Sequence, residues 1–72
     1  MTNVELLEEK IAQSGKKRGY LARKLNLSPQ GFRNLVKGET EFKASQIKVL
    51  CDELGITTAK EKEAIFFAEI GA

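Results

Sequence analysis

Residues 18–38 read RGYLARKLNLSPQGFRNLVKG, and they carry the clearest structural pattern in the chain. Apolar side chains recur at helical spacing on both sides of Asn26. Asparagine tolerates a positive φ better than most residues other than glycine, so Asn26 suits a tight turn. Ser28 and Pro29 then form a favourable helix start, because serine is preferred at the N-cap and proline at the first helical position. The stretch therefore predicts two short helices joined by a turn at Asn26.

The apolar positions of this stretch are expected to share one core. A chain of 72 residues has a thin core, so it cannot leave many apolar groups in water. Ala22 is the small member of the set, and a small residue lets two helices that cross at about 90–120° approach each other closely. The expected core positions are Leu21, Ala22, Leu25, Leu27, Phe32 and Leu35.

Further helices are expected before and after this stretch. Thr2 with Glu5 has the pattern of a capping box, which starts a helix that Gly15 ends. Another helix is expected over about 44–54, where Cys51 should pack in the core.

The last helix is expected to begin at a second capping box, Thr58 with Glu61, and to reach about Ile70. No run alternates apolar and polar residues as a half-buried strand does. The sequence predicts the all-α class: a single small domain over residues 1–72, built of five short helices.

Composition excludes several classes of function. The chain has no histidine and one cysteine, which excludes the usual zinc sites, an internal disulfide and a Ser-His-Asp or Cys-His catalytic set. The longest apolar run covers residues 64–68, whereas a bilayer-spanning helix needs roughly 20 residues. No signal peptide pattern follows Met1. We therefore expect a cytoplasmic protein that is not an enzyme, with no cofactor, no metal and no membrane association.

Charge is distributed unevenly along the chain. The net charge is +2, but residues 16–48 hold nine Lys or Arg against two Glu, a net +7 between two acidic ends. A local basic surface of this kind is typical of proteins that bind polyanions such as nucleic acids. The alternative is a solvated surface on which charge is simply uneven.

The apolar pattern also has a family resemblance. Leu21-Ala22-x-x-Leu25-x-Leu27-Ser28-x-x-x-Phe32-x-x-Leu35-x-x-Gly38, followed by Ile47-x-x-Leu50-Cys51-x-x-Leu54-Gly55-Ile56, resembles the Cro/Xre-type helix-turn-helix family of phage and bacterial regulators. The resemblance implies the lambda repressor-like DNA-binding domain fold, with the helix-turn-helix at about 18–37. The C-terminal tail resembles short regulators from temperate phages of Gram-positive bacteria.

The resemblance implies where DNA would bind. The third helix would lie in the major groove of a double-stranded operator in a bacterial host. The residues expected to read bases are Gln30, Arg33 and Asn34. Those expected to contact phosphates are Arg18, Ser28, Lys37 and Lys43. The alternative for the amides and the lysines is that they are solvated side chains.

Two functions remain open. The first is a Cro-like repressor in a phage lysis/lysogeny switch, which would bind its operator as a dimer. The second is a modulator of repression, or antirepressor, which binds the DNA-binding domain of a partner phage repressor. Pro29 cannot hydrogen-bond a base edge, and Glu39 and Glu41 are acidic where a DNA-facing loop would be basic; these features favour the second function. The residues expected to contact a homodimer partner or a repressor are Phe66, Phe67 and Ile70.

Overall fold

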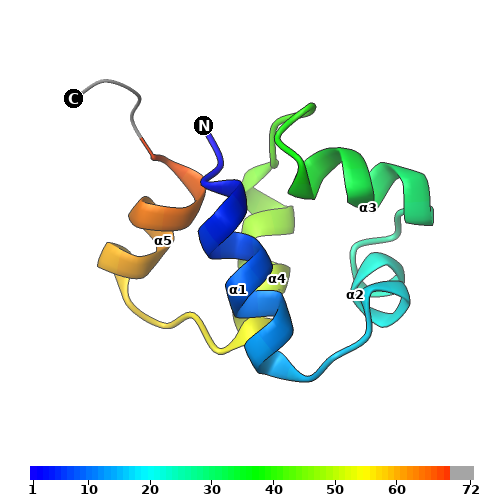
Figure 1. Ribbon diagram of the computed structural model, residues 1–72, viewed down its shortest axis with the longest axis horizontal. Helices are drawn as coiled ribbons and strands as arrows, with labels where there is room; N and C mark the ends of the chain where they lie inside the picture. Colours follow the sequence, from blue (N-terminus) through cyan, green and yellow to red (C-terminus); the bar gives the residue numbers. More distant parts are fainter. Residues whose placement is uncertain (69–72) are drawn as a thin grey trace.

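The computed structural model describes residues 1–68, which contain helices and no strand. The helices are α1 (Val4–Ser14), α2 (Arg18–Lys24), α3 (Pro29–Val36), α4 (Ala44–Leu54) and α5 (Ala59–Phe66). The predicted all-α class with five short helices is confirmed. The α1 and α4 helices occupy the middle of a body measuring 34 × 23 × 21 Å, with α2 and α3 at one end of its long axis and α5 at the other (Figure 1).

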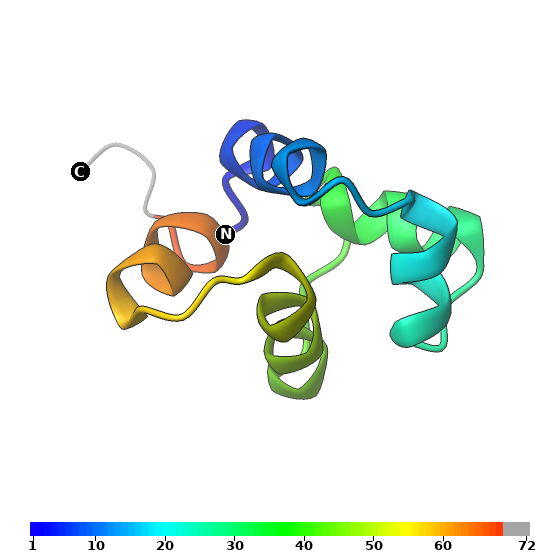
Figure 2. The ribbon, with the colours of Figure 1, turned by 90° about the horizontal axis from the view of Figure 1, so that it is seen from below.

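One apolar core joins all five helices. Figure 2 shows α1 and α4 on opposite sides of the interior, with the chain between α4 and α5 crossing between them in this view. Leu27, one of the expected core positions, is half-buried and packs against the core. The core residues are Leu7, Ile11, Leu21, Ala22, Leu25, Phe32, Leu35, Val36, Leu50, Cys51, Ile56, Ile65 and Phe66. Cys51 therefore packs in the core as expected, and burial raises the pKa of its thiol.

The turn between α2 and α3 has the predicted form. Asn26 adopts a positive φ of 58°. The N–H of Leu27 donates to the carbonyl of Ala22 at 2.9 Å, and the N–H of Asn26 donates to that of Arg23 at 3.0 Å. This pair of bonds is a Schellman motif, which satisfies the last carbonyls of α2. Ser28 then caps α3, since its hydroxyl oxygen accepts from the N–H of Gly31 at 3.0 Å.

The predicted start of α1 is wrong by one residue. Its N-cap is Asn3 and not Thr2, because the Asn3 side chain accepts from the N–H of Leu6 at 3.1 Å. The physical reason is local, because asparagine is preferred over threonine at the N-cap. The N–H of Asn3 also donates to the carbonyl of Ile65 at 2.6 Å, and this bond ties the start of α1 to α5.

The α5 helix is shorter than predicted. Thr58 caps its start as expected, by accepting from the N–H of Glu61. The helix ends at Phe66, and Phe67 takes a non-helical φ of −126°. Phe66 is held in the core, where its ring packs edge-on against Phe42 with centroids 5.1 Å apart. Ile70, at the predicted end of this helix, lies outside the described residues.

Candidate nucleic-acid interface

The α3 helix has one buried face and one polar face. Phe32, Leu35 and Val36 point into the core, since residues three and four apart share one side of a helix. On the opposite side Gln30, Arg33 and Lys37 are exposed, and Asn34 is half-buried. The three residues predicted to read bases are thus brought together on one helix face.

Two of these residues form a pair. The Nε2 amide of Gln30 donates to the Oδ1 oxygen of Asn34 at 3.0 Å, across one turn of α3. The bond uses one donor of Gln30 and one oxygen lone pair of Asn34. It leaves the Gln30 carbonyl oxygen and the Asn34 NH₂ group as an acceptor and a donor for a ligand.

An open depression of about 500 Å³ lies between the polar face of α3 and the start of α2. Most of its charged side chains are cationic, and the one carboxylate among them comes from α1. Its lining residues are Glu8, Arg18, Gly19, Pro29, Gln30, Phe32, Arg33 and Lys37. An anion could therefore approach α3 from this side.

A second hollow, of about 230 Å³, lies on the other flank of α3. Asn34 and Gly31 line it from α3, and Lys43 lines it from the residue before α4. The predicted phosphate-contacting residues are consequently divided. Arg18 and Lys37 lie at the first depression and Lys43 at the second.

Arg18 is already engaged within the chain. Its Nη1 atom lies 2.6 Å from Oε1 of Glu8 on α1, and its guanidinium lies over the ring of Phe32, 5.5 Å from the centroid. Ser28 uses its hydroxyl oxygen to cap α3, so only its O–H is left to donate to a ligand. Lys37 and Lys43 make no ion pair with any residue that the structure describes.

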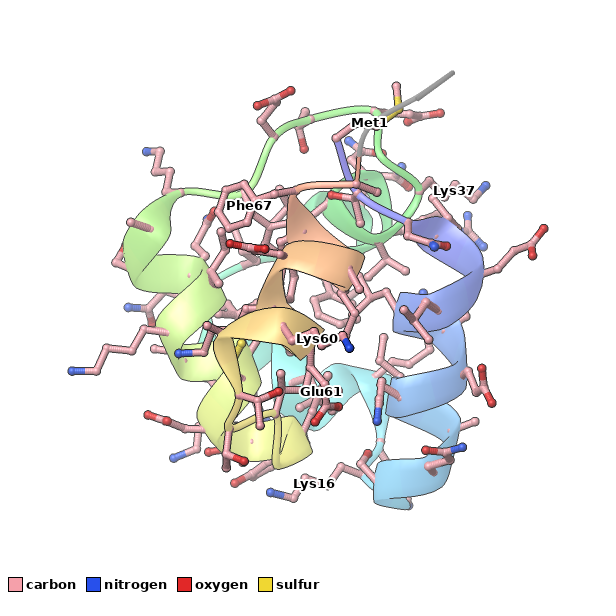
Figure 3. All side chains as sticks on the ribbon, turned by 90° about the vertical axis from the view of Figure 1, so that its left-hand side faces the viewer. Met1, Lys16, Lys37, Lys60, Glu61 and Phe67 are labelled. Carbon is pink, nitrogen blue, oxygen red and sulfur yellow. The ribbon has the colours of Figure 1, made fainter. Side chains whose placement is uncertain are left out.

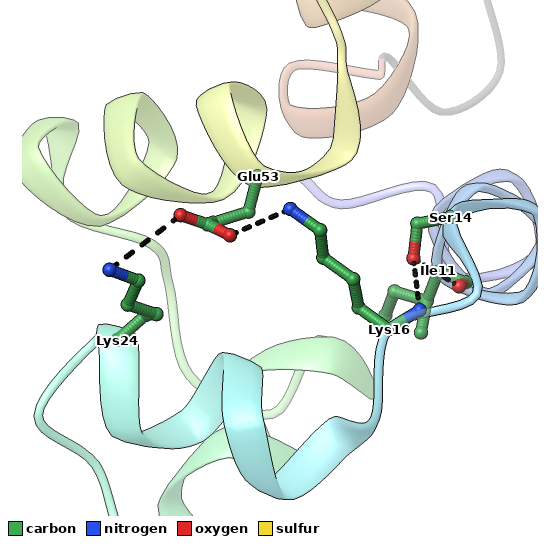
Figure 4. A network of polar contacts seen from close by, with 5 residues as sticks. All are labelled: Ile11, Ser14, Lys16, Lys24 and Glu53. Atoms are coloured by element: carbon green, nitrogen blue, oxygen red, sulfur yellow. Dashed lines mark hydrogen bonds and ion pairs between the residues drawn. The ribbon is translucent and has the colours of Figure 1, made fainter.

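Other cations within residues 16–48 are also paired. Glu53 of α4 lies 2.8 Å from the Nζ of Lys16 and 4.0 Å from that of Lys24 (Figure 4). Hydrogen bonds from Lys16 and from the Tyr20 hydroxyl lower the pKa of Glu53. The hydrogen bond to Glu53 in turn raises the pKa of Lys16. Residues 16–48 are therefore less able to bind an anion than their net charge of +7 indicates.

The sequence did not predict that Glu8 and Glu53 would pair with cations of residues 16–48. Glu8 is ten residues from Arg18 in the chain, and Glu53 is 37 residues from Lys16. No spacing rule for a single helix connects residues so far apart. The charge pattern along the chain therefore could not reveal these pairs.

The predicted association residues are separated by the fold. Phe66 is buried in the core, which corrects its assignment to a contact surface. Phe67 is 58% exposed and lies at the same end of the molecule as Met1, which is 63% exposed (Figure 3). Together with Phe42 and Ile47 they line a shallow hollow of about 90 Å³. Ile70 lies outside the described residues.

Within residues 1–68, no helix has the length and apolar character needed to cross a membrane. The same part of the chain contains no cluster of three or more His, Cys, Asp or Glu side chains that could hold a metal ion. Comparisons with protein-family models, with curated proteins and with solved structures found no match.

Proposed function

We propose that this chain is a DNA-binding transcriptional regulator in which α2 and α3 form a helix-turn-helix and α3 reads operator DNA. The observation that carries the proposal is the polar face of α3, where a hydrogen-bonded pair of amides stands beside two exposed cations. A phage lysis/lysogeny switch is the setting that the sequence resemblance favours for such a regulator.

The amide pair suits base reading. A side-chain amide can donate to N7 and accept from N6 of adenine at once, which is worth roughly 1–3 kcal/mol of discrimination. Gln30 and Asn34 hold each other in place, so less side-chain freedom is lost when a base edge binds. Arg33 lies next to them and could donate to guanine O6 and N7, or to a phosphate.

The hollows on both flanks of α3 support the same geometry. The major groove is about 12 Å wide and admits a helix, with a phosphate backbone on either side. Lys37 lines the hollow on one flank and Lys43 the hollow on the other. In the proposed complex the two lysines would contact opposite strands and set the register of α3.

The direct test is binding of the purified protein to the promoter DNA of its own gene at low salt, measured by gel shift, with selection from random duplexes in parallel. Replacing Gln30 and Asn34 with alanine should relax discrimination between operator and mutated operator by roughly 1–3 kcal/mol per lost base contact. Gln13→Ala is the matched control, because Gln13 is an exposed amide on α1. Absence of binding to either pool of DNA would overturn the proposal.

A second candidate is a modulator that binds the DNA-binding domain of a partner phage repressor. The observation that favours it is the acidic edge of α3: Glu39 and Glu41 are exposed in the loop after this helix, where they would repel phosphates. A protein partner would instead offer cationic side chains to these two glutamates and carboxylates to Arg33. In this case the chain should release the neighbouring repressor from DNA without binding DNA itself, and Arg33→Glu should abolish the complex.

A further inference from the structure

We infer that Glu8 is an internal competitor for the phosphate that Arg18 would bind, and that it lowers the affinity of this chain for all DNA sequences alike. The inference rests on the proposed function of α3. Glu8 belongs to α1, whereas the proposed helix-turn-helix consists of α2 and α3.

The carboxylate of Glu8 occupies the position at Arg18 where a DNA phosphate would bind. Glu8 Oε1 lies 2.6 Å from Nη1 of Arg18, within hydrogen-bonding reach of a guanidinium donor. Carboxylate and phosphate oxygens accept from arginine in the same way. Both side chains line the depression beside α3, so a phosphate entering it would meet Arg18 already occupied.

The ring of Phe32 restricts the positions that the Arg18 guanidinium can adopt. The guanidinium lies 5.5 Å from the centroid of Phe32, which is only 2% exposed and held in the core. Stacking of this kind favours one position of the planar group. Arg18 is therefore held at the depression, and a phosphate must displace Glu8 rather than find Arg18 elsewhere.

The pair can nevertheless open. The two side chains are 45% and 46% exposed, and ion pairs in such positions contribute little to stability. DNA that displaces Glu8 leaves a carboxylate next to its own phosphates, and like charges repel. Binding thus costs both the loss of the pair and this repulsion.

The effect should not depend on DNA sequence. Arg18 would contact a phosphate, and phosphate contacts are shared by specific and non-specific complexes. Removing the charge of Glu8 should therefore strengthen both kinds of binding by the same factor. It should also steepen the dependence of the logarithm of affinity on the logarithm of salt concentration by about one unit.

The test is a comparison of Glu8→Gln with the unsubstituted chain and with Glu9→Gln, on operator and on unrelated duplex DNA. Glu9 is the matched control because it is exposed, is adjacent on α1, and forms no ion pair with the described residues. Glu8→Gln should bind both DNAs several-fold more tightly. Its advantage should shrink about threefold between 50 and 200 mM salt, as expected for one added phosphate contact.

Arg18→Gln, alone and combined with Glu8→Gln, shows whether the effect passes through the pair. The gain from Glu8→Gln should disappear when Arg18 is absent, and thermal unfolding should show that all variants remain folded. An equal gain from Glu9→Gln would mean that net charge alone matters, and a gain that persists without Arg18 would remove the pair from the explanation. Either result overturns the inference.

Failure of the inference can be distinguished from failure of the proposed function. If the unsubstituted chain binds DNA and Glu8→Gln binds no more tightly, only the inference fails. If no variant binds DNA, the proposed function fails and the inference fails with it. Binding by Glu8→Gln alone supports both.

Discussion

At the scale of single residues, Asn26 carries the turn on which the α2–α3 pair depends. Its φ of 58° lies in the left-handed region, which costs most residues with a side chain about 1–2 kcal/mol. The cost is smaller for asparagine than for alanine, and it is absent for glycine. The turn in return allows the two hydrogen bonds that close the end of α2.

We expect Asn26→Ala to lower the free energy of unfolding by about 1 kcal/mol and Asn26→Gly to leave it unchanged or slightly raised. The reason is the left-handed backbone and not the loss of a side-chain contact, since Asn26 is exposed. Urea unfolding followed by circular dichroism gives both values. Equal destabilisation by alanine and glycine would show that the amide side chain, and not the backbone conformation, matters there.

At the scale of elements, α3 forms a polar ridge between two hollows. Lys37 comes directly after it and Lys43 directly before α4, so the ends of two helices place one cation on each flank. Both lysines are exposed. In the proposed complex with DNA, the amides of α3 would contact bases and the two lysines would contact phosphates.

Lys37→Ala and Lys43→Ala should each weaken binding to all DNA sequences by the same factor and lower the salt slope by about one. Fluorescence anisotropy titrations at several salt concentrations measure both effects. Lys60→Ala is the control, because this exposed lysine lies on α5, at the opposite end of the molecule (Figure 3). A loss confined to one DNA sequence would place the lysine among the base-reading residues instead.

At the scale of the whole molecule, ion pairs between helices decide which charges remain available. Glu8 engages Arg18, and Glu53 engages Lys16 and Lys24. The first pair ties α1 to α2, and the others tie α4 to the residues before α2 and to its last residue. All of them neutralise cations at the surface. The packing of the helices therefore lowers the effective positive charge of residues 16–48.

The Glu53 pair makes stability depend on pH. The folded-state pKa of Glu53 is lowered from 4.5, so its contribution is present above that value and is lost as pH falls through the folded-state pKa. The folded-state pKa of Lys16 is raised from 10.5, so its contribution is lost only as pH rises beyond that value. Glu53→Gln should therefore lower the melting temperature at pH 7 and have little effect once the pH is well below 4.5. Melting curves of this variant and of Glu9→Gln across pH check the difference; a deficit that persists in strong acid would point to lost packing instead.

If the regulator is a dimer, we expect the exposed side chain of Phe67 to contribute to self-association. Phe67→Ser should shift the protein toward the monomer in analytical ultracentrifugation and weaken binding to a two-half-site operator. It should leave binding to a single half-site unchanged, because Phe67 is not among the residues proposed to contact DNA. Ala64→Ser, at an exposed position on α5, is the control. An unchanged sedimentation profile would exclude Phe67 from any interface.

The five helices and most of their ends follow from the amino-acid sequence alone. Gly15 ends a helix, and Ser28 and Thr58 begin helices, as expected. Such positions can be predicted because a cap depends on the hydrogen bonds of residues three or four apart. The sequence also placed the polar residues of α3 on one face, since helical periodicity alone decides this.

Which of these residues are available to a ligand depends on how the helices pack together. Packing pairs Arg18 with Glu8, and it buries Phe66 while leaving Phe67 exposed. Each outcome depends on how two helices distant in the chain cross and how deeply they pack. No local pattern contains that information, because a contact between helices is set by the balance of the whole core.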